Sequence, residues 1–437
     1  MTRCLLLLLL LVAPLVRAQT APGAWTLLPA SPQAGRWVDA SFLDPLTGWI
    51  IEGGGKVAAT TDGGDTWAVL DTIPPMLGSG NPGLRTVMFT SRTHGFIGTL
   101  DPGRLLYETT DGGLTWNDVT GRIAGALPEG ICGMWAVDDQ LLYAVGVYYG
   151  PATLLKSTDG GQTWTSRDMS AYAGSLVDVY FWDADHGIAV GGTNGTTPTS
   201  HPVVLATEDG GATWAVRYTG SDSGAWAWKI SFPAPNTGYV SIDGNTSSGA
   251  LVLKTTDRGA TWTEKRIPPS IMAGYLQGVG FVTENVGWVG ENGQAAARTT
   301  DGGATWQAVS VPAGNVNRFE FFGDSLGYAM GARVYRYRRT AVATEPPPVA
   351  AVLELEPAAP NPVSGAVTLA YRLAAPAVVR LAVYDALGRE VAVLHDGPLA
   401  AGAHALTLDT SGWSPGVYVV RVTAGVQTAS ARLVVVR

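Results

Sequence analysis

Two aspartates at matching places in the sequence could carry the chemistry of glycoside hydrolysis. Asp39 and Asp178 each stand three residues before a phenylalanine, Phe42 and Phe181, that closes an apolar segment. Cleavage of a glycosidic bond needs two carboxyl groups at a defined separation, one of which acts as the acid. Equivalent positions of a ring-shaped fold can face one another near its axis. The pair therefore defines an enzymatic alternative, a surface glycoside hydrolase of the glucanase-like kind.

Three arginines could supply a different chemistry, the binding of a carboxylate. Arg36, Arg85 and Arg318 stand at the start of apolar segments and could approach the same axis. A sialidase-like hydrolase would hold its substrate with clustered arginines of this kind. Surface arginines in loops are the simpler interpretation, because such a constellation is recognised by its geometry.

Other catalytic or metal-dependent chemistry has little support in the sequence. It has neither a phosphate-binding loop nor an HExxH sequence, and its five histidines lack the spacing of metal ligands. Cys132 is the one cysteine outside the N-terminal segment and is expected to be a small buried hydrophobe. We therefore predict no catalytic residue, no metal and no cofactor, and we leave the question of an enzyme open, with a non-enzymatic protein favoured.

An internal repeat defines the elements that must position these residues. The sequence TDGGDTW at 61–67 is the first of six closely similar copies, whose final Trp residues are 44 to 50 residues apart. Such a period is typical of the four-stranded blades of a β-propeller. A second pattern, an aromatic residue, a short turn and then usually Gly with a bulky residue, occurs in seven units. The fold class is therefore all-β, with a seven-bladed β-propeller over 19–339 and six or eight blades as the nearest alternatives.

The seventh unit has no repeat of its own to complete it, and the N-terminus offers the missing strand. The segment Ala24–Pro29 resembles the residues that come directly after each repeat, whereas the last unit stops after Arg333–Tyr337. Pairing the two segments would close the ring and remove exposed sheet edges. We expect Trp25–Leu28 to be the outer strand of the seventh blade.

The repeated sequence has the composition of a tight hairpin loop. Asp can accept backbone N–H groups, the glycines supply positive φ, and Trp offers a large apolar face to neighbouring sheets. A structural role is predicted for these pairs: Asp62 and Trp67, Asp111 and Trp116, Asp159 and Trp164, Asp209 and Trp214, Asp257 and Trp262, Asp301 and Trp306. The pattern resembles the Asp-box (BNR) repeat of sialidases, certain endoglucanases and photosystem II assembly factors. The resemblance implies a fold and no particular activity.

Recognition is expected on the face opposite the Asp boxes, where the connecting segments are long and irregular. These segments carry aromatic residues, Tyr148 and Tyr149 in one and Trp226 and Trp228 in another. Irregular loops on a rigid scaffold commonly carry binding function. The candidate ligand-binding residues are therefore Tyr148, Tyr149, Trp226, Trp228, Arg85 and Arg318, and the candidate ligand is a glycan or a protein.

The C-terminal residues differ in rhythm from the repeats. A proline-rich linker over 340–352 precedes short alternating strands that predict a small Ig-like β-sandwich over 353–437. Its motifs include Pro360-Asn361-Pro362, Gly416-Val417-Tyr418 and a closing LVVVR. They resemble the C-terminal sorting domain, type A, of type IX secretion cargo. The resemblance implies a Bacteroidetes-type bacterium, type IX secretion machinery as partner, and secretion or display at the outer-membrane surface.

The N-terminus and the charge agree with export. Residues 1–18 read as a signal peptide, with Arg3 before the apolar run and a cleavage site before Gln19. The run is too short to span a bilayer, so the mature chain should have no transmembrane segment. Removing Arg3 and Arg17 takes the formal charge from −8 to −10, since −8 − 2 = −10. Nucleic acid is therefore not expected as a partner. We interpret the protein as a secreted or cell-surface binding or scaffold module.

Overall fold

The architecture comes from a computed structural model of the chain. It describes residues 23–32, 35–73, 83–195, 198–244, 249–293, 295–312, 315–339, 353–373, 376–386, 389–424 and 427–437. The signal peptide and the proline-rich linker predicted from the sequence lie outside these ranges. The chain divides into two compact units, Met1–Thr340 and Ala341–Arg437.

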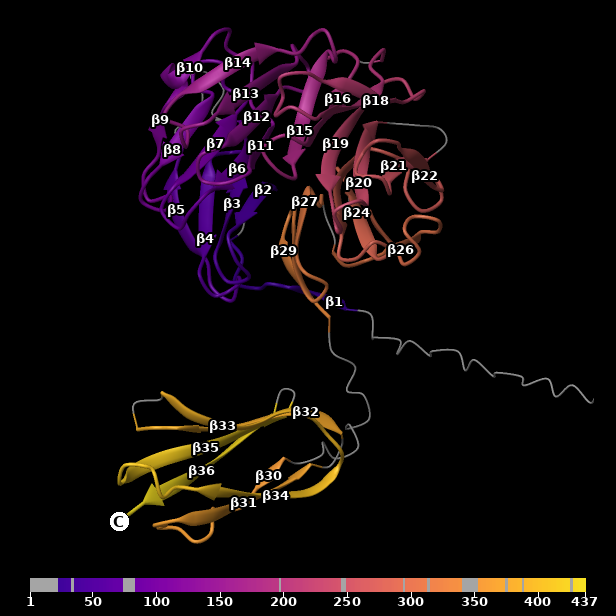
Figure 1. Cartoon of the computed structure of the whole chain (residues 1–437). Helices are drawn as coiled ribbons and strands as arrows, with labels where there is room; N and C mark the ends of the chain where they lie inside the picture. Colours follow the sequence, from indigo (N-terminus) through magenta and orange to yellow (C-terminus); the bar gives the residue numbers. More distant parts are fainter. Residues whose placement is uncertain are drawn as a thin grey trace, which may run out of the picture. The chain divides into compact units, whose positions relative to one another are not determined.

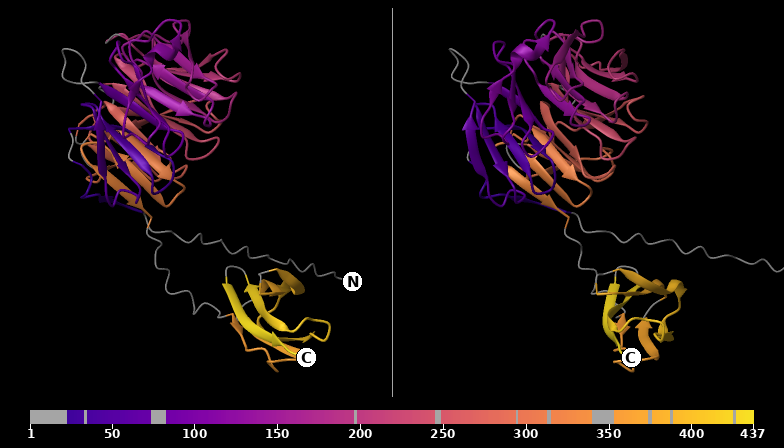
Figure 2. Two further views of the ribbon diagram at one scale, coloured as in Figure 1. Left: turned by 90° about the vertical axis from the view of Figure 1, so that its left-hand side faces the viewer. Right: turned by 60° about the vertical axis from the view of Figure 1, so that its left-hand side comes forward.

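The first unit is a β-propeller, as the repeat predicts. In the residues that the structure describes, seven sheets follow one another around a common axis (Figures 1 and 2). The first blade contains β2 (Trp37–Phe42), β3 (Gly48–Glu52), β4 (Lys56–Thr60) and β5 (Ala68–Thr72). The second contains β6 (Leu84–Phe89), β7 (Gly95–Thr99), β8 (Leu106–Thr109) and β9 (Asn117–Asp118). The third contains β11 (Gly133–Ala136), β12 (Leu142–Gly146), β13 (Thr153–Ser157) and β14 (Trp164–Asp168). A short strand, β10 (Ile123–Ala124), adds to the third blade in parallel with β14 and comes after the 3₁₀ turn Thr120–Arg122.

The remaining four blades continue the same meander. They are β15 (Ser175–Phe181), β16 (Gly187–Gly192), β17 (Pro202–Thr207) and β18 (Ala215–Thr219); β19 (Ala225–Ser231), β20 (Gly238–Gly244), β21 (Ala250–Thr255) and β22 (Thr263–Ile267); β23 (Leu276–Phe281), β24 (Gly287–Glu291), β25 (Ala296–Thr299) and β26 (Gln307–Val309); and β27 (Arg318–Phe322), β28 (Leu326–Met330), β29 (Val334–Arg338) and β1 (Ala24–Leu27). The first strand of each of the first six blades, together with β27, lies at the axis (Figure 1).

The N-terminal strand closes the ring, as expected from the sequence. β1 pairs antiparallel with β29, in a register that runs from Ala24 opposite Arg338 to Leu27 opposite Tyr335. The Trp25 ring packs against Trp288, with ring centroids 5.5 Å apart. The last blade is therefore assembled from the two ends of the propeller sequence, a closure that leaves no open sheet in the ring.

The aromatic–glycine pattern joins each blade to its neighbour. A Cβ added to Gly48 would lie 2.2 Å from the Phe42 ring, so the ring occupies the space that only glycine leaves. The bulky residue after the glycine stacks on the phenylalanine of the next blade, as Trp49 does on Phe89 with centroids 3.6 Å apart. The last such contact, Tyr328 on Phe42 at 4.3 Å, joins the seventh blade to the first.

Each Asp box is a hairpin loop held by its aspartate. In the third box, the Asp159 carboxylate accepts hydrogen bonds from the Thr163 N–H at 2.9 Å, from the Thr163 hydroxyl at 2.6 Å and from Ser157 at 2.8 Å. The two glycines have positive φ, and Arg258, which replaces the first glycine in the fifth box, also has a φ of 60°. The N–H at this position donates to the turn between the first two strands of its own blade, as Gly160 does to Gln140. Boxes and first turns therefore share one face of the propeller.

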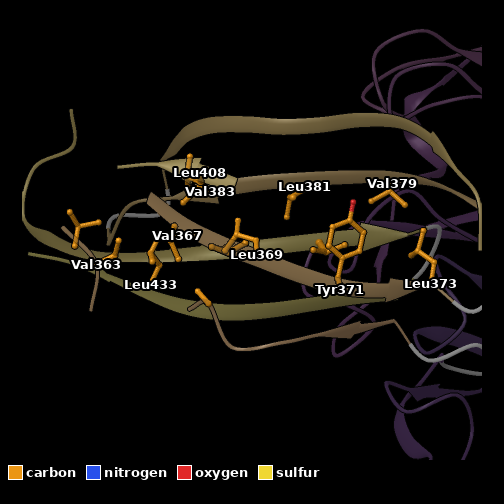
Figure 3. Close-up of a cluster of buried hydrophobic side chains, with 14 residues drawn as sticks. Val363, Val367, Leu369, Tyr371, Leu373, Val379, Leu381, Val383, Leu408 and Leu433 are labelled. Carbon is orange, nitrogen blue, oxygen red and sulfur yellow. The ribbon is translucent and has the colours of Figure 1, made fainter. Parts of the chain in front are cut away.

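The second unit is a β-sandwich of two sheets. One sheet contains β30 (Glu354–Leu355), β31 (Ala366–Leu373) and β34 (Gly402–Asp409); the other contains β33 (Glu390–Leu399), β32 (Ala377–Tyr384), β35 (Gly416–Ala424) and β36 (Gln427–Val435). Alternate residues of the strands face inward, as Val367, Leu369 and Tyr371 do from β31 (Figure 3).

The Pro-Asn-Pro motif is hydrogen-bonded to the last strand of this sandwich. The Asn361 side chain donates to the Arg432 carbonyl and accepts from the Val434 N–H, both at 2.8 Å. Its amide therefore imitates a neighbouring strand and fastens the segment before β31 to the last strand, β36.

Candidate functional site

The propeller axis divides into three levels. The first strands run from the face of the variable loops to the face of the Asp boxes, and their polar residues therefore lie at successive depths. We call the two openings the variable-loop end and the box end. The middle level, between them, is built by Asp39, Asp178, Lys229 and Arg318.

The two matching aspartates meet at the middle level, but an arginine stands between them. Arg318 Nε lies 3.4 Å from Asp39 Oδ1, and Arg318 Nη1 lies 3.5 Å from Asp178 Oδ2. Lys229 Nζ adds a longer contact of 3.9 Å with Asp178. Both carboxylate side chains are almost fully buried, 3% and 5% exposed. The aspartates therefore form a buried ionic network that carries the charge of Arg318.

The aspartates also hold the inner strands together. The register of β2 shifts at Asp39, and that of β15 shifts at Asp178, so each irregularity directs a carboxylate across to the next blade. Asp39 accepts the Val87 N–H and Asp178 accepts the Ile230 N–H, each at 3.2 Å. This gives the matching positions a structural reason that the sequence alone does not reveal.

Two arginines, Arg36 and Arg85, and the carboxylate of Glu52 line a cavity at the variable-loop end. Arg36 donates from Nε to Asn317 at 3.0 Å and also donates to Gln277. Arg85 shares with Arg36 the lining of this cavity, whose volume is about 320 Å³. Within the described ranges, neither arginine has an ion-pair partner at salt-bridge distance. Burial, and then the neighbouring charge of Arg85, lower the pKa of Arg36 to about 10.

One buried carboxyl group lies near these arginines. Asp243 accepts a hydrogen bond from Gln277 Nε2 at 3.1 Å. Burial raises the pKa of Asp243 to about 6, against the opposing effects of this hydrogen bond and of the two arginines. Below that pH the cluster has two guanidinium groups and no facing negative charge from Asp243.

The predicted aromatic residues gather beside Arg85. Its guanidinium carbon lies 5.8 Å from the centre of the Tyr148 ring and 5.5 Å from that of Trp228. Tyr148 in turn contacts Tyr149, with centroids 4.9 Å apart. Trp226 packs against the same hydrophobic cluster and donates to the Asn194 carbonyl at 3.2 Å. Five of the six predicted ligand-binding residues are therefore brought together.

Three details of that prediction differ from the structure. Trp226 and Trp228 belong to strand β19 rather than to an irregular loop, and Trp228 is only 5% exposed. Tyr149, at 37%, is the most open of the four rings. Arg318 lies apart from the others at the middle level, where its side chain is 19% exposed, so the interpretation of it as a surface arginine is wrong.

The box end has a different character. A cavity of about 660 Å³ opens there, lined by aromatic side chains and by carboxylates (Trp135, Tyr180, Phe232, Phe321, Glu284 and Glu320). The rings form a continuous wall, since Tyr180 contacts Trp135 at 4.5 Å and Phe232 at 5.0 Å. Glu320 accepts the Phe42 N–H at 3.4 Å through Oε1, whereas its Oε2 is shielded from solvent and has no hydrogen-bond partner in the described part of the chain.

Several residues of these clusters were not predicted from the sequence. Gln277, Asp243 and Glu320 are polar residues inside apolar strands, and Asn317 directly precedes such a strand, which is the signal that could have singled them out. Two Gly-x-Ser-x-Gly sequences, at 323–327 and 412–416, also went unnoticed. Their serines are exposed and lie in turns between strands, not in the strand-to-helix elbow that activates such a nucleophile.

Three further observations concern metal ligands, apolar helices and the buried cysteine. Across the parts of the chain that the structure describes, His, Cys, Asp and Glu side chains nowhere gather in threes as metal ligands would. Among the same residues, no helix has the length and apolar character needed to cross a membrane. Cys132 is 1% exposed and unpaired, and burial raises the pKa of its thiol.

Known proteins resemble the two units separately. Residues 358–436 match the family described as "Secretion system C-terminal sorting domain". The chain is 30% identical over 161 residues to the photosystem II assembly lipoprotein Ycf48 of Synechococcus sp. (strain CC9902), covering 36% of this chain and 43% of that protein. It is 27% identical over 240 residues to a xyloglucanase of Paenibacillus sp., covering 48% of this chain and 23% of the enzyme. The chain thus spans less than half the length of these curated relatives.

Solved structures resemble the propeller in fold. A structure of YCF48 from Cyanidioschyzon merolae has a TM-score of 0.53 and 20% identity, covering 72% of this chain and 99% of that one. YCF48 bound to a D1 peptide has a TM-score of 0.51 and 18% identity, covering 74% and 98%. The protein is thus a β-propeller with a type IX secretion sorting tail. The tail directs it through the periplasm to the medium or to the outer-membrane surface.

Proposed function

We propose that the propeller is a non-enzymatic binding or scaffold module for an extracellular ligand that bears a carboxylate. The observation that carries this proposal is the pair Arg36 and Arg85, which share one cavity at the variable-loop end and have no ion-pair partner among the described residues there. Guanidinium groups suit the planar geometry of a carboxylate. The acidic side chain of a protein or an acidic sugar of a glycan would supply it.

The aromatic residues beside Arg85 favour a role for this arginine in ligand binding, because they hold its guanidinium group in place. Tyr148 and Trp228 fix the guanidinium from the side, and Tyr149 and Trp226 extend the apolar surface. Asn317 and Gln277 orient Arg36. Groups held in place before binding lose less entropy when the ligand arrives. The four rings and Arg85 thus retain the ligand-binding role assigned to them from the sequence.

The rival function is hydrolysis of a surface glycan. The similarity to a xyloglucanase supports this alternative, for which Asp39 and Asp178 of this chain would be the catalytic pair. The guanidinium of Arg318 fills the space between these two carboxylates, so no glycosidic bond could lie between them. This arrangement favours the binding module.

The test uses purified full-length protein on an array that includes polygalacturonate, hyaluronan, xyloglucan and acidic peptides, with a reducing-end assay on the same polysaccharides. We expect retention of carboxylate-bearing probes and no new reducing ends. Arg36→Ala and Arg85→Ala should each weaken binding at least roughly tenfold. Arg92→Ala is the matched control, because Arg92 is 66% exposed and paired with Asp44 on the other face.

Two outcomes would overturn the proposal. One is the release of reducing ends from a neutral glycan such as xyloglucan, which would make the chain a hydrolase. The other is equal retention by Arg85→Ala and by the parent protein. Binding to acidic peptides but not to acidic polysaccharides would identify a protein ligand, and the converse result would identify a glycan.

We propose also that the mature chain begins at Gln19 and that the tail is removed within or after the linker 340–352, as its Bacteroidetes-type sorting sequence implies. Mass spectrometry of medium and surface fractions checks both positions. A surface product that retains Arg437 throughout would contradict removal of the tail.

A further inference from the structure

The box-end cavity has features that neither the fold nor the variable-loop end explains. It is formed by the C-terminal parts of inner strands in blades three to seven, and its volume of about 660 Å³ lies in the range of small-molecule sites. Its wall of rings includes Trp135, Tyr180 and Phe232. Aromatic surface that faces a cavity is not covered by a neighbouring side chain, so a ligand can pack against it.

The charges around this cavity favour a positive ligand. Arg318, the cation at its floor, is already paired with Asp39 and Asp178. Asp324 is paired with Arg339. Glu284 accepts the Thr237 hydroxyl at 2.6 Å, and it interacts electrostatically with Lys254. Above a pH of about 7, Glu320 and Glu284 therefore give the cavity lining two carboxylates that form no ion pair at salt-bridge distance with another described residue.

Glu320 has a buried carboxylate oxygen that lacks a hydrogen-bond donor among the described residues. Its Oε2 is shielded from solvent and has no hydrogen-bond partner in the described residues, although Glu320 lines the cavity. A buried carboxylate without a donor on one oxygen is costly, and a positive charge in the adjoining cavity would lower that cost through space, without contact with Oε2. Burial accordingly raises the pKa of Glu320 to about 7.

We propose that the box-end cavity binds an organic cation, an ammonium group whose substituents pack on the aromatic wall while its charge faces Glu320 and Glu284. Ammonium ions lie favourably over the faces of tryptophan and tyrosine rings, and the attraction grows when the site is shielded from water. This site is separate from the carboxylate site proposed at the variable-loop end, so the two proposals can fail independently.

The experiment compares choline with 3,3-dimethyl-1-butanol, its uncharged analogue of the same shape, by ligand-observed NMR titration of the full-length protein. We expect choline to bind at least roughly tenfold more tightly than the alcohol. Glu320→Gln should remove most of that preference. Glu284→Gln, at an exposed rim position, should reduce it by a smaller factor and keeps the test valid if Glu320→Gln does not fold.

Glu208→Gln is the matched control, since Glu208 is an exposed acid of an Asp-box loop, 73% exposed and paired with Arg217. It should leave the affinity for choline unchanged. Equal binding of choline and the alcohol would overturn the proposal, as would no binding of choline to the parent protein or unchanged binding in both Glu320→Gln and Glu284→Gln. Because none of these changes touches Arg36 or Arg85, retention of acidic probes reports on the other site alone.

Discussion

The two ends of the propeller axis are built from the same strands and differ in charge. At the variable-loop end, the first residues of the inner strands present Arg36 and Arg85 without ion-pair partners in the described residues. At the box end, the C-terminal parts of these strands and the turns after them present rings and the carboxyl groups of Glu284 and Glu320. The layer of Asp39, Arg318 and Asp178 separates them. Strand direction gives every blade a distinct start and finish, so one kind of blade provides two ends of different composition, for which we propose ligands of opposite charge.

The largest expected effect comes from opening the ring, which would destroy both ends together. Deletion of Ala24–Pro29 removes β1, exposes the edge of β29 and uncovers the rings around Trp25. We expect a loss of several kcal/mol from the roughly 5 to 15 kcal/mol that stabilise a domain, with aggregation. Thermal melts of a chain that begins at Gly23 give the control. An unchanged midpoint in the deletion variant would show that β1 is not needed for closure.

The next largest effect should come from the layer that separates the two ends. Arg318→Met would leave Asp39 and Asp178 buried without the guanidinium that joins them. Breaking a buried ion pair by removal of one partner costs about 3–5 kcal/mol. Denaturant unfolding measures the loss, and Arg338→Met, an exposed change on β29, serves as the control. A loss below about 1 kcal/mol would mean that the aspartates do not depend on Arg318.

These two variants mark the line between what the sequence could and could not predict. The seven blades and the pairing of β1 with β29 are consequences of periodicity, since each repeat encodes the same strands and turns. The position of Arg318 between two aspartates could not be predicted, because it depends on blades one, four and seven meeting at the axis. Asp39 and Asp178 were correctly expected opposite one another, and the chemistry inferred from them changed once a third side chain was found between them.

The same limit applies to the aromatic residues. Tyr148, Trp226 and Trp228 are predicted as binding residues because they were assigned to irregular segments, and they do cluster. Their strand assignment and the burial of Trp228 escaped prediction, because β19 begins earlier than its composition indicates. Glu320 was overlooked, since a single acid within an apolar strand has no local pattern.

A smaller effect is expected at an Asp box, away from both ends. Asp159→Ala removes three hydrogen bonds from one hairpin loop and should lower the thermal midpoint by a few degrees without changing either ligand preference. Asp139→Ala, an exposed change in a neighbouring turn, is the control. Normal stability combined with lost binding would contradict a structural role for the box.

The Asp159 carboxylate should also make the stability of the folded protein depend on pH in the acidic range. Hydrogen bonds from Thr163 lower the pKa of Asp159 to about 2, below the roughly 3.9 expected in the unfolded chain. A lowered pKa stabilises the folded state above the unfolded value, and this contribution is lost as the pH falls from about 4 to about 2. Acid unfolding of the parent protein and of Asp159→Ala should therefore converge over that range.

The smallest expected effect is a difference in sign between the two ends. Burial raises the pKa of Asp243 to about 6 and that of Glu320 to about 7, so each carboxyl group is neutral below its pKa and negative above it. Near Arg36 and Arg85, loss of the Asp243 charge should strengthen binding of a carboxylate as the pH falls through about 6. At the box end, gain of the Glu320 charge should strengthen binding of choline as the pH rises through about 7.

Opposite slopes are expected from the surroundings of each group. Asp243 faces Gln277, Arg36 and Arg85, whereas Glu320 faces Arg318 and Asp39 and shares its cavity with Glu284 and Asp324. The gain or loss of one charge a few ångströms from the ligand changes the affinity roughly fivefold, or by about 1 kcal/mol. Titrations at about pH 5 and about pH 8, either side of both pKa values, with an acidic oligosaccharide and with choline measure the two slopes. Asp243→Asn should flatten the first alone and Glu320→Gln the second alone, and slopes of the same sign would refute the opposition between the ends.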